Sequence, residues 1–210
     1  MPTLYNLIQG RSLERLAALS DGIFAVAMTL LVLDLHIPSA EQIHSESELI
    51  HALAALAPQW ITYGMSFLTL GIFWAGQQTQ LNHIARGTRD LTWIHLGFLF
   101  VVTLVPFSTR LLAEFITYKL AIGIYWLNIL ALGATLYWSW MHAVRANLVK
   151  EDTPGEIRHS ICRRITIAQS LYAAGAALCF YRTWLSIAVI VIVQLNYAIA
   201  PRFRQSSPGN

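Results

Sequence analysis

Two aspartates lie near the ends of an apolar stretch, "LSDGIFAVAMTLLVLDL", which runs from Leu19 to Leu35. Only 12 residues separate Asp21 from Asp34, and a helix of that length covers roughly 18 Å, well short of the ~30 Å hydrocarbon core of a bilayer. A helix that crosses a membrane here therefore carries at least one carboxylate at membrane depth. Such a group can attract cations, transfer protons or tie helices together.

The other residues that could do chemistry give weak support for a metal centre or an enzyme. None of the seven histidines lies three or four positions from another histidine or from an inward carboxylate, so metal or haem ligation is not predicted. His95 is the histidine well inside an apolar segment, where a hydrogen-bonded core role is expected. Cys162 and Cys179 form no CxxC pair. No P-loop, dinucleotide fingerprint or nucleophile elbow occurs, so we expect no cofactor and no enzyme.

The composition is typical of a polytopic membrane protein. Hydrophobic residues make up 56% of the 210 residues and charged residues only 12%, against about 25% in a soluble domain. Seven Trp and eight Tyr suit anchoring at the membrane interfaces. The first apolar segment contains Ser20, Asp21 and Gly22 and precedes no small-residue cleavage site, so a retained helix is expected rather than a signal peptide.

The apolar segments predict an all-α fold with six transmembrane helices in one domain that covers residues 1–210. Pro58 is expected in the first turn of the second helix, which is the longest and is expected to tilt or to project beyond the bilayer. Arg182 alone separates the last two helices, which predicts a tight helical hairpin. The approximate spans are 16–37, 52–82, 91–109, 120–141, 165–181 and 183–200.

The positive charges set the predicted topology. With six spans, 11 of the 14 Lys and Arg residues lie on the side that also holds both termini, which predicts cytoplasmic termini. They are Arg11, Arg15, Arg86, Arg89, Arg145, Lys150, Arg158, Arg163, Arg164, Arg202 and Arg204. Contact of the loop from Arg145 to Arg164 with anionic lipid remains an alternative to this ordinary charge bias.

The first helix has an apolar stripe along one face. At 100° per residue, the stripe holds Leu16, Leu19, Ile23, Val26, Ala27, Leu30, Asp34 and Ile37. One interpretation makes Ile23, Val26 or Ala27, and Leu30 successive hydrophobic rings of a pore, with Asp34 as an acidic ring at the outer mouth. The alternative is ordinary helix packing, with Asp34 reaching the headgroups.

Asp21 points away from this stripe. An acidic side chain inside a helix bundle needs a partner, and Arg15 is not on the same helical face. Candidate partners on other helices are His95, Asn82, Gln77, Gln78, Trp74 and Trp93. A structural tie and a proton or ion site are both open.

The first apolar helix resembles that of a known family of membrane proteins. "RLAALSDGIFAVAMTLLVLDLHIP", from Arg15 to Pro38, resembles the first-helix signature of the transmembrane-protein-175 potassium-channel family, with Arg15, Ser20 and Asp21 in the motif and Leu19 in its Phe position. "GIFWAGQQTQLNHIAR" and "LTWIHLGFLFVVTLVPFSTRLL" are similar to the second and third helices of that family. The resemblance covers roughly the first 112 residues, and the last three helices match in number and hydropathy.

The resemblance implies a homotetramer of six-helix chains in a prokaryotic plasma membrane, with the first helix lining a potassium-selective pore. By motif position, Ile23, Val26 or Ala27, and Leu30 supply the constriction, and potassium passes transiently near Ile23 and Leu30. The sequence contains no TVGYG-like filter loop, which agrees. Two departures stand out: Gln77 and Gln78 follow the second-helix Trp where relatives carry His, and Val26 stands where some relatives have Thr.

A secondary transporter or proton-linked cation carrier is the main alternative, and a non-conducting membrane assembly is the third. Six-helix transporters usually show inverted repeats or broken helices, and neither is clear in this sequence. Gly64 and Gly71 in the second helix are interpreted as close-packing positions rather than breaks.

Overall fold

The structure is a computed structural model that describes residues 13–36, 38–39 and 43–199. Its helices run along the chain as α2 (Leu13–Leu30), η1 (Leu31–Asp34), α3 (Glu46–Ala55), α4 (Ala57–Asn82), α5 (Arg89–Thr103), α6 (Val105–Glu114), α7 (Lys119–Arg145), α8 (Gly155–Ala177), η3 (Leu178–Phe180) and α9 (Thr183–Ile199). The only strand-like pairing in the described part of the chain is an isolated bridge between Ile84 and Val149, so the predicted all-α class is confirmed.

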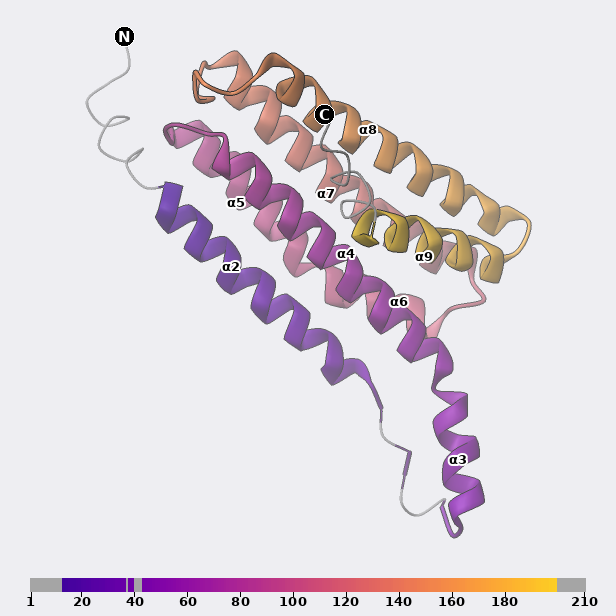
Figure 1. Cartoon of the computed structure of the whole chain (residues 1–210). Helices are drawn as coiled ribbons and strands as arrows, with labels where there is room; N and C mark the ends of the chain where they lie inside the picture. The colour runs from indigo at the N-terminus through magenta and orange to yellow at the C-terminus, as the bar shows by residue number, and fades with distance from the viewer. Residues whose placement is uncertain (1–12, 37, 40–42, 200–210) are drawn as a thin grey trace, which may run out of the picture.

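The long helices form one bundle with α2 on one side and α8 and α9 on the opposite side (Figure 1). The main core joins residues from α2, η1 and α4 through α9, including Phe24, Met65, Phe98, Tyr125 and Ile190. Phe24 and Phe98 bring α2 and α5 together with ring centroids 5.9 Å apart. This shared core places all the long helices in one folding unit.

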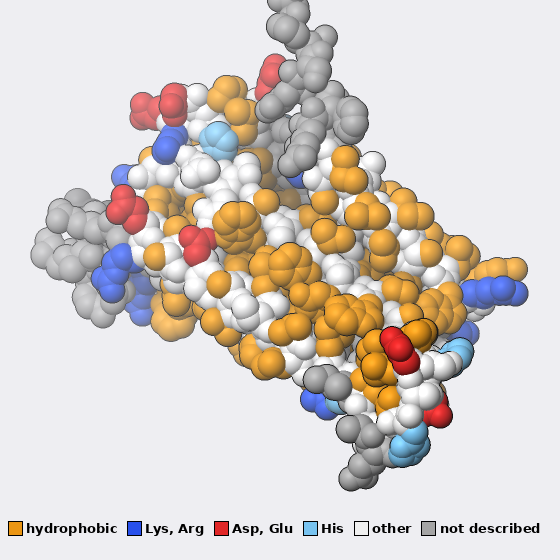
Figure 2. Space-filling view, turned by 60° about the horizontal axis from the view of Figure 1, so that its bottom comes forward, with side chains coloured by type: hydrophobic (Ala, Val, Ile, Leu, Met, Phe, Trp, Pro, Cys, Tyr) orange, Lys and Arg blue, Asp and Glu red, His pale blue; other side chains and the backbone are white. Residues whose placement is uncertain are grey.

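Three helices among the described residues are long and apolar enough to cross a membrane, namely Leu13–Asp34, Arg89–Glu114 and Lys119–Arg145. Thr183–Ile199 is a shorter apolar helix. On the face shown in Figure 2, charged side chains gather near the ends and hydrophobic side chains cover the stretch between them. The chain is therefore a membrane protein by its apolar helices, and the count of six spans stays a prediction.

Prolines divide two of the expected helices. Pro58 lies in the first turn of α4, as expected, but Leu56 separates α4 from a short preceding helix, α3. Leu104 likewise ends α5, and Pro106 lies in the first turn of α6. A proline lacks a backbone N–H and is accommodated at a helix start, so each marks a new helix instead of continuing the old one.

α3 stands apart from the bundle. It carries no buried residue and extends beyond the end of the bundle (Figure 1). Its start is capped reciprocally, because Ser45 accepts the Glu48 N–H at 3.3 Å and the Glu48 carboxylate accepts the His44 N–H at 2.7 Å. The expectation that the second apolar segment tilts or projects beyond the bilayer stays a prediction.

Other helix ends differ from the expected spans. The first helix ends at Asp34 instead of residue 37, which lies outside the described residues, as does residue 200 at the expected end of the last span. α6 continues to Glu114 and α8 begins at Gly155, ten residues before the expected span, because its first turns are basic but still helical. α9 agrees with the predicted sixth helix, and Tyr181 and Arg182 alone separate it from η3, as the predicted hairpin requires.

Two loops are joined at one end of the bundle. Ala85 donates to the Leu148 carbonyl at 2.8 Å and Lys150 donates to the His83 carbonyl at 2.9 Å. Asn147, with φ of 53°, turns the chain at the end of α7, and asparagine tolerates this left-handed conformation better than most residues. The loops 83–88 and 146–154 thus lie at the same end, as the topology predicts.

Candidate pore-lining face

α2 presents an apolar face that no other part of the described chain covers. Leu19, Val26 and Leu30 are exposed, Val26 to 57%, and Ile23 is half-buried. They lie along an open groove of about 410 Å³. A contiguous apolar face of this kind requires lipid or further protein to cover it.

The opposite face of α2 points into the core. Leu16, Phe24, Ala27 and Leu31 are buried there, and Ala27 keeps only 2% of its surface. Of the two candidates for the middle level of the stripe, Ala27 thus packs inside its own chain, whereas Val26 faces outward. Ala27 still borders the groove, so both residues stay candidates for the middle level, and Val26 is the more exposed of the two.

The second wall of the groove comes from the junction of α5 and α6. Thr103 and Pro106 line it together with the α2 stripe. The Thr103 hydroxyl donates to the Phe100 carbonyl at 2.7 Å, so its polarity is satisfied within its own helix. Sequence analysis missed these two residues, because the proximity of the α5–α6 break to α2 follows from tertiary packing and not from local spacing.

Ser20 and Asp21 attach α2 to α4. The Ser20 hydroxyl donates to the Gln77 amide oxygen, and both groups are buried. The Asp21 carboxylate accepts the Trp74 indole N–H and the Gln78 amide N–H, each at 2.7 Å. Trp74 and Gln78 were among the predicted partners, and we call this set of contacts the α2–α4 clasp.

The clasp explains how a carboxylate is accommodated at membrane depth. Asp21 lies eight positions after Leu13, the described start of α2, which places it about 12 Å along the helix. Two short hydrogen bonds from α4 stabilise its charge there. Gln77 and Gln78 stand after the second-helix Trp, where relatives of the family carry His. In this chain Gln77 accepts a hydrogen bond from Ser20 and Gln78 donates one to Asp21.

Asp34 lies close to a cation from another helix, a contact that the sequence analysis did not predict. Its side chain is 22% exposed, and its Oδ1 lies 3.9 Å from Nη1 of Arg110 on α6. Arg110 Nε in turn donates to Glu114 at 3.0 Å. These two carboxylates and one guanidinium together carry one net negative charge.

Arg15, the remaining residue of the motif, is exposed on the first turn of α2. The structure gives it no hydrogen bond or ion pair within the described residues. It lies at the end of α2 that is opposite to Asp34, in agreement with its predicted position on the basic side of the bundle.

A second polar cluster lies deeper in the bundle and was missed by the sequence analysis. The Tyr125 hydroxyl lies 3.2 Å from Ser66 and 3.1 Å from Thr69, Thr109 donates to Ser66 at 2.7 Å, and Gln194 donates to Thr69 at 2.8 Å. All five side chains are buried. They connect α4, α6, α7 and α9, a structural role that suits polar groups within an apolar bundle.

His95 is buried, and its Nδ1 lies 3.2 Å from the Ser139 hydroxyl. The expectation of a hydrogen-bonded core histidine is therefore confirmed. No group of three or more His, Cys, Asp and Glu side chains that could hold a metal ion occurs among the described residues. Cys162 and Cys179 are both free thiols.

Comparisons with known proteins identify the family. Residues 15–106 match the family described as "Endosomal/lysosomal potassium channel TMEM175". A Streptomyces collinus protein named a potassium channel is 32% identical over 190 residues, which cover 87% of this chain and 90% of the relative. The similarity therefore continues into the last three helices, beyond the first 112 residues on which the resemblance was based.

A solved structure and a vertebrate relative extend the comparison. The crystal structure of a lysosomal potassium-selective channel TMEM175 homologue from Chamaesiphon minutus superimposes with a TM-score of 0.79 at 27% identity, covering 90% of this chain and 97% of that one. A Gallus gallus protein named an endosomal/lysosomal proton channel is 28% identical over 116 residues, which cover 53% of this chain and 23% of that protein. The family is one of ion channels and not of enzymes, and this chain belongs to the TMEM175 family.

Proposed function

We propose that the chain assembles as a homotetramer to form a potassium-preferring cation channel, with the exposed stripe of α2 lining the pore. The observation that carries the proposal is the groove along α2, where Val26 and Leu30 are exposed and Ile23 is half-buried, on a helix that is packed against and hydrogen-bonded to its own subunit along another face. Relatives named potassium channels support the choice of ion.

Hydrophobic rings favour potassium through dehydration. In a tetramer, each of Ile23, Val26 and Leu30 forms a ring of four side chains, and a narrow apolar ring admits an ion only when its water shell is removed or deformed. Potassium holds its shell less tightly than sodium, so the barrier is lower for potassium. The same rings close the pore to ions when water leaves them.

The outer mouth is weakly acidic in this proposal. Asp34 and Glu114 flank Arg110, and the net negative charge of these three side chains in each subunit raises the local concentration of cations. Salt screens this effect over about 8–10 Å, so it acts on conductance at low ionic strength more than on selectivity. The proposed orientation places both termini in the cytoplasm of a prokaryotic cell.

Planar-bilayer recordings test the proposal. Purified protein under opposing potassium and sodium gradients should give unitary currents with a reversal potential toward the potassium equilibrium potential. Ile23→Ala should shift that potential toward zero, because the widened ring no longer requires dehydration. Ile192→Ala, which truncates an exposed isoleucine on α9, is the matched control and should leave selectivity unchanged.

Two outcomes would contradict the proposal. An unchanged potassium-to-sodium permeability ratio in Ile23→Ala would remove Ile23 from the filter. An absence of unitary steps in folded, oligomeric protein would favour a transporter or a non-conducting assembly.

Proton conduction is the second candidate function, suggested by the name of the vertebrate relative. A pH gradient imposed in the absence of potassium and sodium distinguishes it, because a proton pore then sets the reversal potential.

A further inference from the structure

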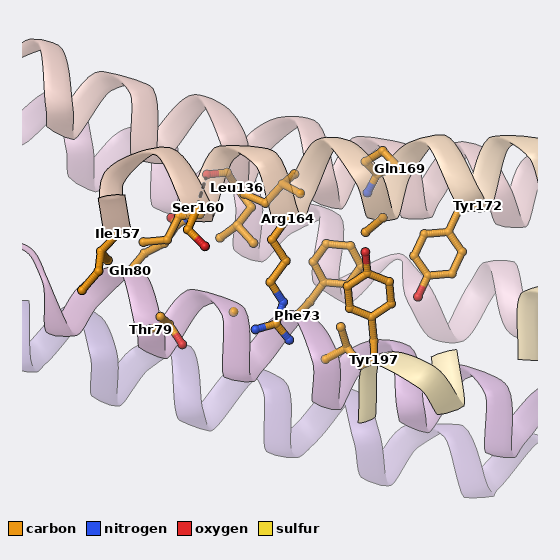
Figure 3. Close-up of a pocket in the computed structure, with 15 residues that line it drawn as sticks. Phe73, Thr79, Gln80, Leu136, Ile157, Ser160, Arg164, Gln169, Tyr172 and Tyr197 are labelled. Carbon is orange, nitrogen blue, oxygen red and sulfur yellow. Dashed lines mark hydrogen bonds between the residues drawn. The ribbon is translucent and has the colours of Figure 1, made fainter. Parts of the chain in front are cut away.

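A cavity of about 230 Å³ opens between α4, α7, α8 and α9, on the side of the bundle away from α2 (Figure 3). Thr79 and Gln80 near the end of α4 and Ile157 and Ser160 near the start of α8 place one part of it at the end of the bundle that carries the joined loops. The cavity thus lies far from the α2 stripe, and its role is separate from that of the proposed pore.

The cavity changes character along its length. Thr79 and Ser160 line the part toward the loop end, and Ile72, Ala168, Gln169 and Tyr172 line the part toward the middle of the bundle. The Arg164 guanidinium lies between the two parts, beside Phe73 (Figure 3). A polar end followed by an apolar slot is the pattern of a phospholipid, whose headgroup stays at the interface while its chain enters the hydrocarbon. The volume suits a headgroup and the first part of one chain, with the rest lying along the outside of the bundle.

Arg164 supplies the charge. Figure 3 shows its side chain extending from α8 toward α4, and its guanidinium carbon lies 5.7 Å from the Tyr197 ring. No carboxylate of the described residues lies within ion-pair distance of it. Arg164 directly precedes the apolar part of α8, where an arginine is stabilised by extending its charged group to the interface or by binding an anion.

The surroundings favour an anionic headgroup over a neutral one. Arg158, Arg163 and Arg164 lie on the first turns of α8, and Arg145 and Lys150 lie at the same end of the bundle. Glu151, Asp152 and Glu156 also lie there, so these eight side chains carry a net charge of +2. Each such cation near a negatively charged leaflet contributes about 1 kcal/mol of attraction. A guanidinium can bind a phosphate through two parallel N–H···O hydrogen bonds, so the interaction depends on geometry as well as on charge.

We propose that this cavity binds one anionic phospholipid from the adjoining leaflet, with its phosphate on Arg164 and an acyl chain along Phe73 and Ala168. Ser160 lies at the polar end, where its hydroxyl can donate to the same phosphate. The proposal is independent of the pore, because it rests on a cavity that none of the α2 residues lines.

The test uses the full chain in a mild detergent and native mass spectrometry to count bound lipids. Wild-type protein should retain phosphatidylglycerol in preference to phosphatidylcholine of the same acyl composition. Arg164→Gln should weaken the retention of phosphatidylglycerol about tenfold, as the loss of one charged hydrogen-bonding group predicts. Arg163→Gln removes the same charge from the neighbouring position on α8, outside the cavity, and should keep most of the preference.

A second variant tests the slot without changing the charge. Ala168→Leu fills the apolar part of the cavity and should lower phosphatidylglycerol retention while Arg164 is intact; a thermal melt confirms that the variant is folded. Glycerol phosphate, which has the headgroup but no chain, should not compete at concentrations that match the lipid.

Three results would overturn the proposal. Equal losses of phosphatidylglycerol retention in Arg164→Gln and Arg163→Gln would mean that the general positive charge of the surface, and not the cavity, holds the lipid. Full retention in folded Ala168→Leu would mean that the slot is unused. Competition by glycerol phosphate as strong as that by the lipid would mean a site for free phosphate.

Discussion

The α2–α4 clasp predicts that Asp21→Ala weakens folding and assembly more than it changes ion preference. The substitution removes the acceptor of two hydrogen bonds, each 2.7 Å long, from Trp74 and Gln78. It leaves the Ile23, Val26 and Leu30 face intact, because Asp21 points away from that face toward α4. The expected damage is therefore to the attachment of the helix and not to the surface that meets ions.

The magnitude follows from the two bonds. Hydrogen bonds to charged groups contribute about 1.5–3 kcal/mol each in soluble proteins, whereas side-chain hydrogen bonds in membrane bundles average about 0.6 kcal/mol with a maximum near 1.7. Asp21 is exposed in the single chain, which favours the lower values. We expect a loss of about 1–3 kcal/mol for Asp21→Ala and a smaller loss for Asp21→Asn, which keeps an acceptor oxygen but not its charge.

The assay is thermal unfolding in detergent, followed by sizing of the assembled fraction and bilayer recordings from that fraction. A loss of about 2 kcal/mol lowers the unfolding midpoint by about 4–8 °C in a chain of this size. Asp152→Ala removes an exposed carboxylate from the turn before α8 and serves as the control. An Asp21→Ala assembly with an unchanged midpoint and an altered potassium-to-sodium ratio would refute this reasoning.

Three further predictions concern packing and the pore. Gly133→Ala should destabilise the fold, because a Cβ there would overlap a glutamine side chain from α8, whereas Gly64→Ala, with no atom within 4 Å of its Cβ, should be nearly neutral in the same thermal melt. Asp34→Asn should lower single-channel conductance at low salt and have little effect at high salt, measured across a series of potassium concentrations. Ala27→Leu should lower the unfolding midpoint by overpacking the core, whereas Val26→Leu should preserve the midpoint and reduce conductance by narrowing the proposed pore.

The sequence predicted features that depend on local composition or on a single strong constraint. Apolar stretches predicted the all-α class, and the single arginine between the last two segments predicted their hairpin. The need of a carboxylate in an apolar helix for a partner narrowed the choices for Asp21 to a set that contained Trp74 and Gln78. Each of these features depends on residues that are close in the sequence or on the contact between two helices, so one physical requirement is enough to predict it.

Features that arise from packing between distant segments were not predicted. The Gln194–Thr69 hydrogen bond joins residues 125 positions apart, and no local spacing indicates it. The expected close packing at Gly64 and Gly71 was wrong within the chain, where a Cβ at either meets nothing within 4 Å. Neighbouring helices instead approach Gly76, Gly133 and Gly175, most closely at Gly133. Spacing of seven shows that two glycines share a face but not whether a helix packs on that face.

The arrangement of α2 separates the residues that hold the helix from those that would meet ions. Phe24, Ala27 and the clasp lie on the side that faces the rest of the chain, whereas Val26 and Leu30 make no comparable contacts within it. In the proposed channel, substitutions on the outward face should therefore change permeation with little effect on the stability of the chain, because they remove few internal contacts. Substitutions on the inward face change stability first and reach the pore only by displacing the helix. This separation leaves the composition of the rings free to vary while the Ser20–Asp21 attachment holds α2 in place.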